Sequence, residues 1–106
     1  MIKSSGNRIS PTEVEEAAEA TGLVAEAVAL GVPDAALGAA VAIVARAATG
    51  MDAATVEADL RARLRADLPN FMQPRFVLIR ADLPRNPNGK LDRVAITEQA
   101  LAELTA

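Results

Sequence analysis

Two apolar runs, separated by a turn, constrain this chain more than any other feature. Residues 23–32 and 39–47 each have the length of a strand, and both alternating faces of each run are largely apolar. Pro33-Asp34 follows the first run and is typical of a turn. Because a strand that is apolar on both sides must be covered on both sides, we expect helices over at least part of each face of the sheet.

Alternation along the first run predicts which side chains share a face. One face is expected to carry Val24, Val28 and Leu30, and the opposite face Ala25, Ala27 and Ala29. Glu26 interrupts the apolar pattern near the start of the run.

Capping signals place a first helix close to the N-terminus. Ser10 is a good N-cap, and Pro11 suits the first helical position because its missing N–H costs nothing there. Glu13, three residues after Ser10, completes a capping box. Carboxylates in the first turns also favour the helix dipole, which explains the acidic cluster of Glu13, Glu15 and Glu16 without a catalytic role. The expected inward stripe is Val14, Ala17, Ala18 and Thr21, and Gly22 ends the helix.

The second half of the chain predicts two more helices and a strand. Asp52 can cap a helix over 53–68, with Glu57–Arg61 and Asp59–Arg63 as outward pairs and an inward stripe of Val56, Leu60, Leu64 and Leu68. Residues 76–79, introduced by Pro74, are expected as a short strand at an edge or a strand start. Asp92 can cap a last helix that bears Val94, Ala95, Leu101 and Leu104.

These elements predict an α+β fold in a single domain over residues 1–106. A small three-stranded sheet is flanked by helices, with a hairpin or loop around the Ser4–Asn7 turn cluster at the N-terminus. Near the C-terminus, the tight-turn sequence Asn86-Pro87-Asn88-Gly89 forms a loop just before Lys90.

Composition excludes several classes of function. The 106 residues include no Cys and no His, so the usual zinc sites, a Ser-His-Asp triad and a thiol nucleophile are ruled out. Phe71 and Phe76 are the only aromatic residues, which argues against stacking on nucleic acid. No stretch resembles a signal peptide or a membrane span, so we expect a cytoplasmic protein. An excess of Lys and Arg in segments 1–10 and 75–93 of this acidic chain suggests local anion contacts.

Three motifs, in order along the whole chain, resemble one family. Residues 2–15 (IKSSGNRISPTEVE) look like the segment that opens the small C-terminal subdomain of adenylate-forming enzymes. This superfamily contains acyl-CoA synthetases, the adenylation domains of nonribosomal peptide synthetases, and luciferases. Residues 83–93 (LPRNPNGKLDR) look like its final motif, and Gly31-Val32-Pro33-Asp34 with Gly38 is similar to its turn between two strands. Pro11 favours the acyl-CoA ligase branch, whereas residues 88–93 are closer to the peptide-synthetase version.

The resemblance implies a mobile lid on a larger N-terminal domain that this sequence does not contain. That domain would hold the phosphate-binding loop and the adenine and acyl pockets, and would supply Mg²⁺. The substrates implied are ATP, a carboxylic acid, and CoA or the pantetheine arm of a carrier protein. We therefore expect an AMP-forming acid–thiol ligase whose isolated lid is inactive and binds none of these tightly, and we expect no metal site in the lid.

Four site residues follow from the motif positions. The resemblance gives Lys90 a catalytic role in forming the acyl-adenylate. It places Gly6 and Arg8 in the loop that meets CoA or pantetheine during thioester formation, after the lid rotates. Arg65 lies where some relatives keep a basic residue near the phosphates of CoA. A protein acetyltransferase acting on Lys90 is an expected partner, as for some relatives.

Other interpretations of the same residues stay open. None of three site residues requires a functional role. Lys90 can be a solvated lysine in a turn, Gly6 a glycine that the hairpin needs, and Arg65 a solvated arginine on a helix. The chain is alternatively a free-standing module that binds CoA or a carrier protein or completes a separate large domain, or the lid of a peptide-synthetase-like enzyme. A regulatory or assembly domain without nucleotide chemistry is the remaining alternative.

Overall fold

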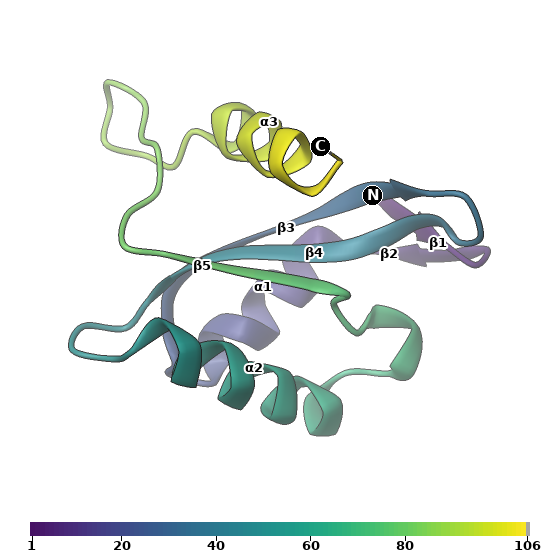
Figure 1. Ribbon diagram of the computed structural model, residues 1–106, viewed down its shortest axis with the longest axis horizontal. Coiled ribbons are helices and arrows are strands. Elements are labelled where there is room, and N and C mark those ends of the chain that lie inside the picture. Colours follow the sequence, from purple (N-terminus) through teal and green to yellow (C-terminus); the bar gives the residue numbers. More distant parts are fainter. Residues whose placement is uncertain (106) are drawn as a thin grey trace.

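The computed structural model describes residues 1–105 and confirms the expected order of helices and strands, to which it adds one short 3₁₀ helix that was not predicted (Figure 1). Along the chain these are β1 (Ile2–Ser4), β2 (Asn7–Ile9), α1 (Pro11–Ala20), β3 (Val24–Asp34), β4 (Gly38–Ala47), α2 (Ala53–Asp67), the 3₁₀ helix η1 (Asn70–Met72), β5 (Phe76–Arg80) and α3 (Arg93–Leu104).

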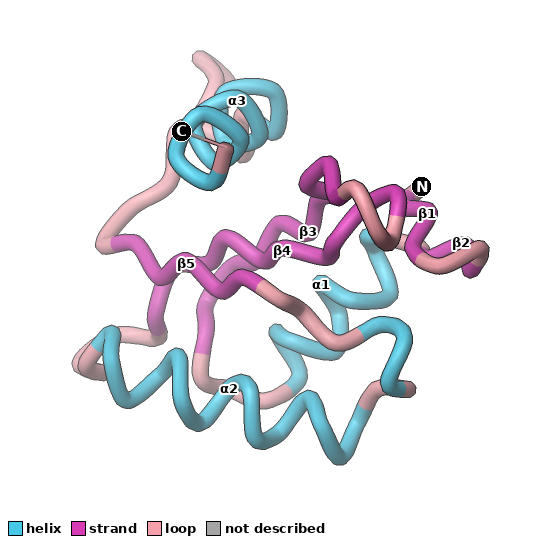
Figure 2. Tube along the Cα trace, turned by 45° about the vertical axis from the view of Figure 1, so that its right-hand side comes forward, coloured by secondary structure: helices cyan, strands magenta, loops and turns pink. Residues whose placement is uncertain are grey.

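The main sheet has the strand order β3-β4-β5, in which β3 and β4 are antiparallel and β4 and β5 are parallel. β5 therefore lies at an edge, as expected for a strand that follows Pro74. α1 and α2 cover one face of the sheet and α3 lies over the other (Figures 1 and 2). Two separate apolar clusters fill these two interfaces. The predicted α+β class is confirmed. No helix in the described part of the chain is long and apolar enough to cross a bilayer.

The N-terminal residues form the hairpin that the Ser4–Asn7 cluster predicted. β1 and β2 are antiparallel, and the two residues between them, Ser5 and Gly6, have φ angles of 51° and 81°. Two successive residues with positive φ form the tight turn that matches the twist of paired strands. Glycine adopts this conformation without strain, which explains why residue 6 is a glycine.

The predicted faces of β3 were wrong at Val24. Val24 shares a cluster with Ala27 and Ala29 under α1 and α2, whereas Val28 and Leu30 face α3. The pairing of β3 with β4 shifts register between Val24 and Glu26. A bulge inserts one extra residue, so strict alternation fails across it and the side chain before it changes face.

In the C-terminal helix, Leu101 and Leu104 pack against the cluster under α3, but Val94 does not. Ile96 and Ala100 are its buried residues, while Val94 is 69% exposed. In α2 the cap and the inward stripe are as predicted, because Asp52 accepts the Thr55 N–H at 3.1 Å and the stripe is buried. The pair Glu57–Arg61 forms at 3.6 Å, but Asp59 and Arg63 are not paired among the described residues.

Carboxylates of α1 lie along the free edge of β3. Ser10 accepts the N–H of Glu13 at 3.4 Å, which confirms the N-cap. Glu15, however, is buried and accepts the N–H of Ala29 at 2.8 Å, and Glu19 accepts that of Ala27 at 3.3 Å. The helix dipole is therefore not a full account of Glu15. These side chains satisfy donors that an edge strand would otherwise leave unpaired.

Candidate functional site

The Lys90 loop is a tight hairpin that is ordered by its own hydrogen bonds. The Asn86 N–H donates to the Lys90 carbonyl at 2.8 Å, and the Gly89 N–H donates to the Asn86 carbonyl at 2.9 Å. The Asn86 side chain also accepts the N–H groups of Asn88 at 2.9 Å and Lys90 at 3.1 Å. One asparagine thus fixes the shape of the turn, as its residue type favours.

The Lys90 side chain is exposed and has no ion-pair partner among residues 1–105. Its ammonium therefore keeps three donors available for an anion outside this chain. The hairpin projects beside the start of α3, away from the sheet (Figure 1).

Arg85 connects this hairpin to the sheet, a contact that the sequence did not predict. Its guanidinium donates to both carboxylate oxygens of Glu26 at 2.6 Å and to the carbonyl of Gly89 at 3.2 Å. Arg46, directly opposite Glu26 in the β3–β4 register, holds the same carboxylate at 3.0 Å. The hydrogen bond from Arg85, helped by Arg46 and opposed by partial burial, lowers the pKa of Glu26 below its ordinary value. An acid within an apolar strand was the sequence signal for this cluster.

Arg93 ties the start of α3 to α1. Its guanidinium donates to both oxygens of Glu15, each at 2.8 Å, and this pairing raises the pKa of Arg93. Asp92 caps the helix by accepting the Ala95 N–H at 3.0 Å, as predicted. The C-terminal end of the Lys90 hairpin therefore leads into a firmly held helix.

The hairpin of Gly6 and Arg8 is docked on the turn between β3 and β4. The Ser5 N–H donates to the Leu37 carbonyl at 2.8 Å. Gly6 is exposed, and a Cβ added to it would meet no atom within 4 Å. Arg8 is exposed opposite Lys3 in the β1–β2 register. Gly6 therefore presents open backbone, and Arg8 presents a cation beside it.

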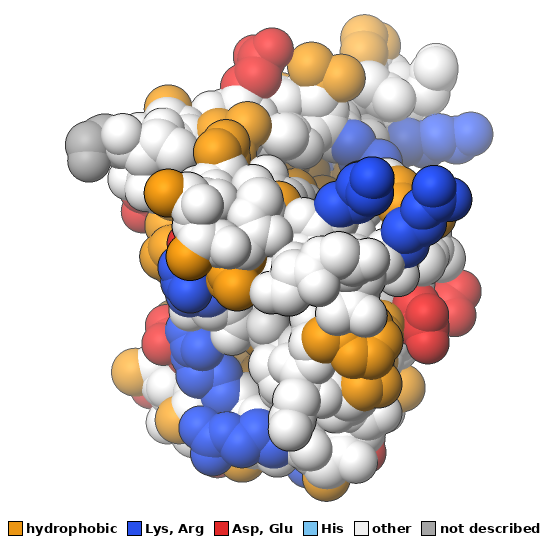
Figure 3. All heavy atoms as spheres, turned by 90° about the vertical axis from the view of Figure 1, so that its right-hand side faces the viewer, with side chains coloured by type: hydrophobic (Ala, Val, Ile, Leu, Met, Phe, Trp, Pro, Cys, Tyr) orange, Lys and Arg blue, Asp and Glu red, His pale blue; other side chains and the backbone are white. Residues whose placement is uncertain are grey.

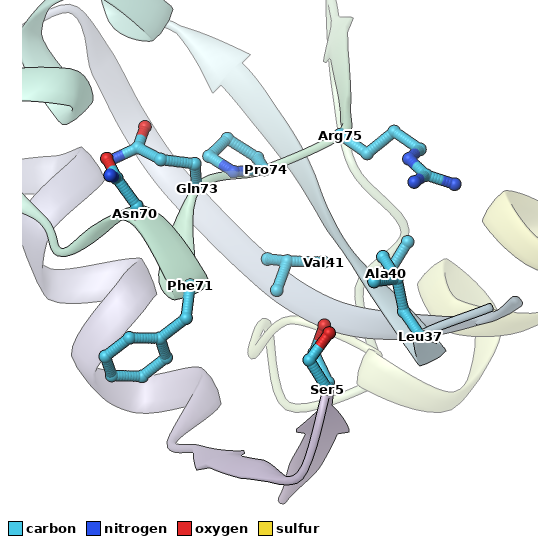
Figure 4. Close-up of a pocket in the computed structure, with 10 residues that line it drawn as sticks. Ser5, Leu37, Ala40, Val41, Asn70, Phe71, Gln73, Pro74 and Arg75 are labelled. Atoms are coloured by element: carbon cyan, nitrogen blue, oxygen red, sulfur yellow. The ribbon is translucent and has the colours of Figure 1, made fainter.

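A groove of about 430 Å³ adjoins this hairpin (Figure 4). Its walls come from the β1–β2 turn, the β3–β4 turn, η1 and the entry to β5, and its lining residues include Ser5, Leu37, Asn70, Phe71, Gln73 and Arg75. Phe71 is 43% exposed and supplies an apolar part of the wall. The groove thus combines an apolar wall with hydroxyl, amide and guanidinium groups.

The structure separates the predicted site residues into two groups. The β1–β2 hairpin, which carries Gly6 and Arg8, lies at one end of the long axis, and the loop between β5 and α3, which carries Lys90, lies toward the other (Figure 1). Arg65 is exposed in the last turn of α2, which leads through η1 to the groove beside Ser5. Figure 3 views the end that carries β1 and β2, where Lys and Arg side chains gather in two groups on either side of uncharged surface.

Comparison with known proteins places this arrangement in a family. Residues 13–90 match the model of the AMP-binding enzyme C-terminal domain. A probable non-canonical nonribosomal peptide synthetase, CymA of Salinispora arenicola, is 39% identical over 98 residues, which are 92% of this chain and 1% of CymA. The fatty acid–[acyl-carrier-protein] ligase MmaC of Mycobacterium marinum is 33% identical over 103 residues, or 94% of this chain and 19% of that protein.

A solved structure matches the whole fold. The crystal structure of an acyl-CoA synthetase from Brucella canis aligns with a TM-score of 0.84 and 31% identity. The alignment covers 99% of this chain and 19% of the Brucella chain. The chain therefore spans about a fifth or less of the length of these relatives.

Proposed function

Because the chain belongs to the family of AMP-binding enzyme C-terminal domains, we propose that it acts as the mobile lid of an AMP-forming acyl-CoA ligase. Lys90 serves ATP-dependent formation of an acyl-adenylate. After the lid rotates, the loop of Gly6 and Arg8 serves thioester formation with CoA. A larger N-terminal domain supplies the remaining groups, including those that hold Mg²⁺, so the lid is not competent alone.

The chemistry of the first half-reaction explains the need for Lys90. A carboxylate attacks the α-phosphate of ATP and pyrophosphate leaves, so two anions must approach each other. A cation that is aimed at the attacking and phosphate oxygens offsets this repulsion and stabilises charge in the transition state. The exposed ammonium at the tip of an ordered hairpin suits this role, because it enters a site on another domain without rearranging its own turn.

The second half-reaction requires a different surface. The thiol of CoA attacks the acyl-adenylate carbonyl and AMP leaves, so the pantetheine arm must reach the acyl group. The open backbone at Gly6 permits close approach of that arm, and the adjoining groove offers amide and hydroxyl partners to its amides. Arg8 is assigned to a phosphate or to a carboxylate of the large domain, and Arg65 to the phosphates of CoA.

The observation that carries the proposal is the position of these two surfaces at opposite ends of the fold (Figure 1). A single lid orientation cannot present both ends to one active site. Rotation between two orientations resolves this difficulty, with Lys90 inward in the first and the Gly6 hairpin inward in the second. The acceptor thiol is CoA in this proposal. Similarity to MmaC, a fatty acid–[acyl-carrier-protein] ligase, favours a carrier-protein pantetheine as the alternative.

The test compares the two half-reactions in the complete enzyme that contains this domain. Carboxylic acids, fatty acids among them, are first screened for ATP–pyrophosphate exchange with the wild type. Lys90→Ala is then expected to lower exchange while thioester formation from preformed acyl-adenylate is retained. Gly6→Leu is expected to do the reverse, because its side chain occupies the open backbone at the turn.

Two results would contradict these expectations. Equal losses in both half-reactions for both variants would contradict rotation. Failure of every acid to support exchange with the wild type would contradict the ligase assignment itself.

A further inference from the structure

The hydrogen bonds within the Lys90 hairpin fix its shape but not its direction. All the bonds made by Asn86 lie within residues 86–90 and would survive a tilt of the whole hairpin. The direction in which Lys90 projects depends on how the stems are held. Leu83, before the first stem, is buried in the core. Asp92, at the end of the second stem, donates its N–H to the carbonyl of Pro84 at 2.9 Å. These contacts lie at the base of the hairpin, on the side away from its tip.

Arg85 reaches further toward the tip. One nitrogen of its guanidinium donates to the carbonyl of Gly89, the residue before Lys90, and the other donates to Glu26 on β3. Glu26 is only 20% exposed and is also held by Arg46 on β4. A continuous chain of contacts therefore runs from two strands of the sheet to the residue that precedes the ammonium-bearing one. The planar fork of arginine suits such a bridge, whereas a lysine supplies a single point charge.

We propose that Arg85 and Glu26 are positioning residues for the adenylation step, which set the direction of Lys90 without contacting ATP or the acid. This inference rests on the proposed function of Lys90. With Arg85 bound on both sides, its two donating nitrogens are directed at Glu26 and Gly89. Glu26, at the far side of the bridge, faces Arg46 and Arg85 and lies on the sheet, not on the hairpin.

The expected effect follows from the geometry of phosphoryl transfer. A displacement of a catalytic group by about 1 Å can cost roughly 100-fold in rate. Removing Arg85 leaves Lys90, its turn and the held base of the hairpin intact but removes the contact between the sheet and the carbonyl before Lys90. The hairpin can then tilt about its base, so kcat falls while binding of ATP by the large domain is unchanged. Arg85→Met is therefore expected to lower kcat for ATP–pyrophosphate exchange by about 10- to 100-fold, with KM for ATP nearly constant.

The experiment uses the complete enzyme and a double-mutant cycle. Arg85→Met, Glu26→Gln and the double variant are compared with the wild type for exchange and for thioester formation from preformed acyl-adenylate. We expect Glu26→Gln to lose less than Arg85→Met, and the double variant to lose no more than Arg85→Met, because the two residues act through one bridge. Thioester formation should be retained in all three, which shows that the protein is folded.

Arg61 provides a matched control. It also bridges a carboxylate, Glu57 at 3.6 Å, and backbone carbonyls, those of Pro74 at 3.2 Å and Arg75 at 3.1 Å, but on the opposite side of the sheet. Arg61→Met should leave ATP–pyrophosphate exchange near the wild-type level. Equal losses for Arg61→Met and Arg85→Met would indicate general destabilisation and overturn the inference.

Three further results would overturn it. Wild-type exchange in Arg85→Met would exclude a positioning role for Arg85. An increase in its KM for ATP at constant kcat would identify Arg85 as a nucleotide contact. Losses that multiply in the double variant would show that Arg85 and Glu26 do not act through one bridge. Lys90→Ala, measured alongside, separates the two proposals. If it retains full exchange, the proposed role of Lys90 fails; if it loses exchange while Arg85→Met does not, only the positioning role fails.

Discussion

The pair Glu15–Arg93 permits a sharp test of what holds α3 to the rest of the fold. Glu15 is 6% exposed at its side chain and accepts three hydrogen bonds, two from Arg93 and one from the Ala29 N–H. Arg93→Met removes the cation and leaves the buried carboxylate with a single donor. Removing one partner of a fully buried pair costs about 3–5 kcal/mol, because the other charge stays buried without compensation.

The expected cost here is smaller, because the Arg93 side chain is 57% exposed and water can partly replace it. We expect a loss of about 2 kcal/mol in the free energy of unfolding. For a domain of this size, about 2 kcal/mol corresponds to a fall in Tm of roughly 8–16 °C. Urea and thermal unfolding of the 106-residue chain, followed by circular dichroism, measure both quantities.

A second variant distinguishes a buried charge from a merely missing contact. Glu15→Gln keeps an acceptor for the Ala29 N–H but carries no charge. The double variant Glu15→Gln/Arg93→Met is therefore expected to be more stable than Arg93→Met alone, by about 1 kcal/mol. The exposed pair Arg80–Glu103 supplies the control, and Arg80→Met should change stability by at most about 1 kcal/mol. Equal losses for Arg93→Met and Arg80→Met, or additive losses in the double variant, would refute this reasoning.

Three other predictions concern the carboxylate of Asp34, the ammonium of Lys90 and the activity of the isolated chain. The N–H groups of Leu37 and Ala36 and the guanidinium of Arg75 hold the pKa of Asp34 below its ordinary 3.8, as Arg85 does most strongly for Glu26. A carboxyl group whose pKa is lower in the folded than in the unfolded state stabilises the fold at pH values above its unfolded-state pKa. The free energy of unfolding should therefore fall as the pH drops below about 5. Asp34→Asn should make this fall with pH less steep when it is measured by urea unfolding. A protein acetyltransferase with an acetyl donor is expected to modify Lys90 in preference to Lys3, which mass spectrometry would show. Acetylation of Lys90 should suppress acyl-adenylate formation in exchange assays of the complete enzyme without unfolding the chain, because it removes the charge. Preference for Lys3, or full activity after acetylation of Lys90, would contradict this. The isolated chain should catalyse no ATP–pyrophosphate exchange, because it supplies one cation without a nucleotide pocket, and measurable exchange would contradict the lid assignment.

Local signals were sufficient for the elements of this fold. Ser10, Asp52 and Asp92 cap the three helices as their residue types and positions predicted. Gly6 and Gly89 have positive φ in the two tight turns. These features depend on a few neighbouring residues, so they can be derived from a short stretch of sequence.

Features that depend on distant residues were not predictable in this way. The bulge before Glu26 exchanges the face of Val24, and nothing in the alternation of the run marks it. Glu15 meets Arg93 across 78 positions, and Glu26 meets Arg85 across 59. Such partners become neighbours only after the sheet is assembled. Lys90 was a candidate from its motif alone, whereas the contacts of Arg85 with Glu26 and Gly89 required the structure.

The most direct test of the central claim is ATP–pyrophosphate exchange by the complete enzyme with Lys90→Ala, beside Lys3→Ala as the matched loss of one exposed lysine. A cation that stabilises charge in the transition state should cost about 100- to 1,000-fold when removed, by analogy with the loss of a single oxyanion-hole donor. We expect a loss of that size for Lys90→Ala and exchange within about twofold of the wild type for Lys3→Ala. Wild-type exchange in Lys90→Ala, or equal losses in both variants, would contradict it.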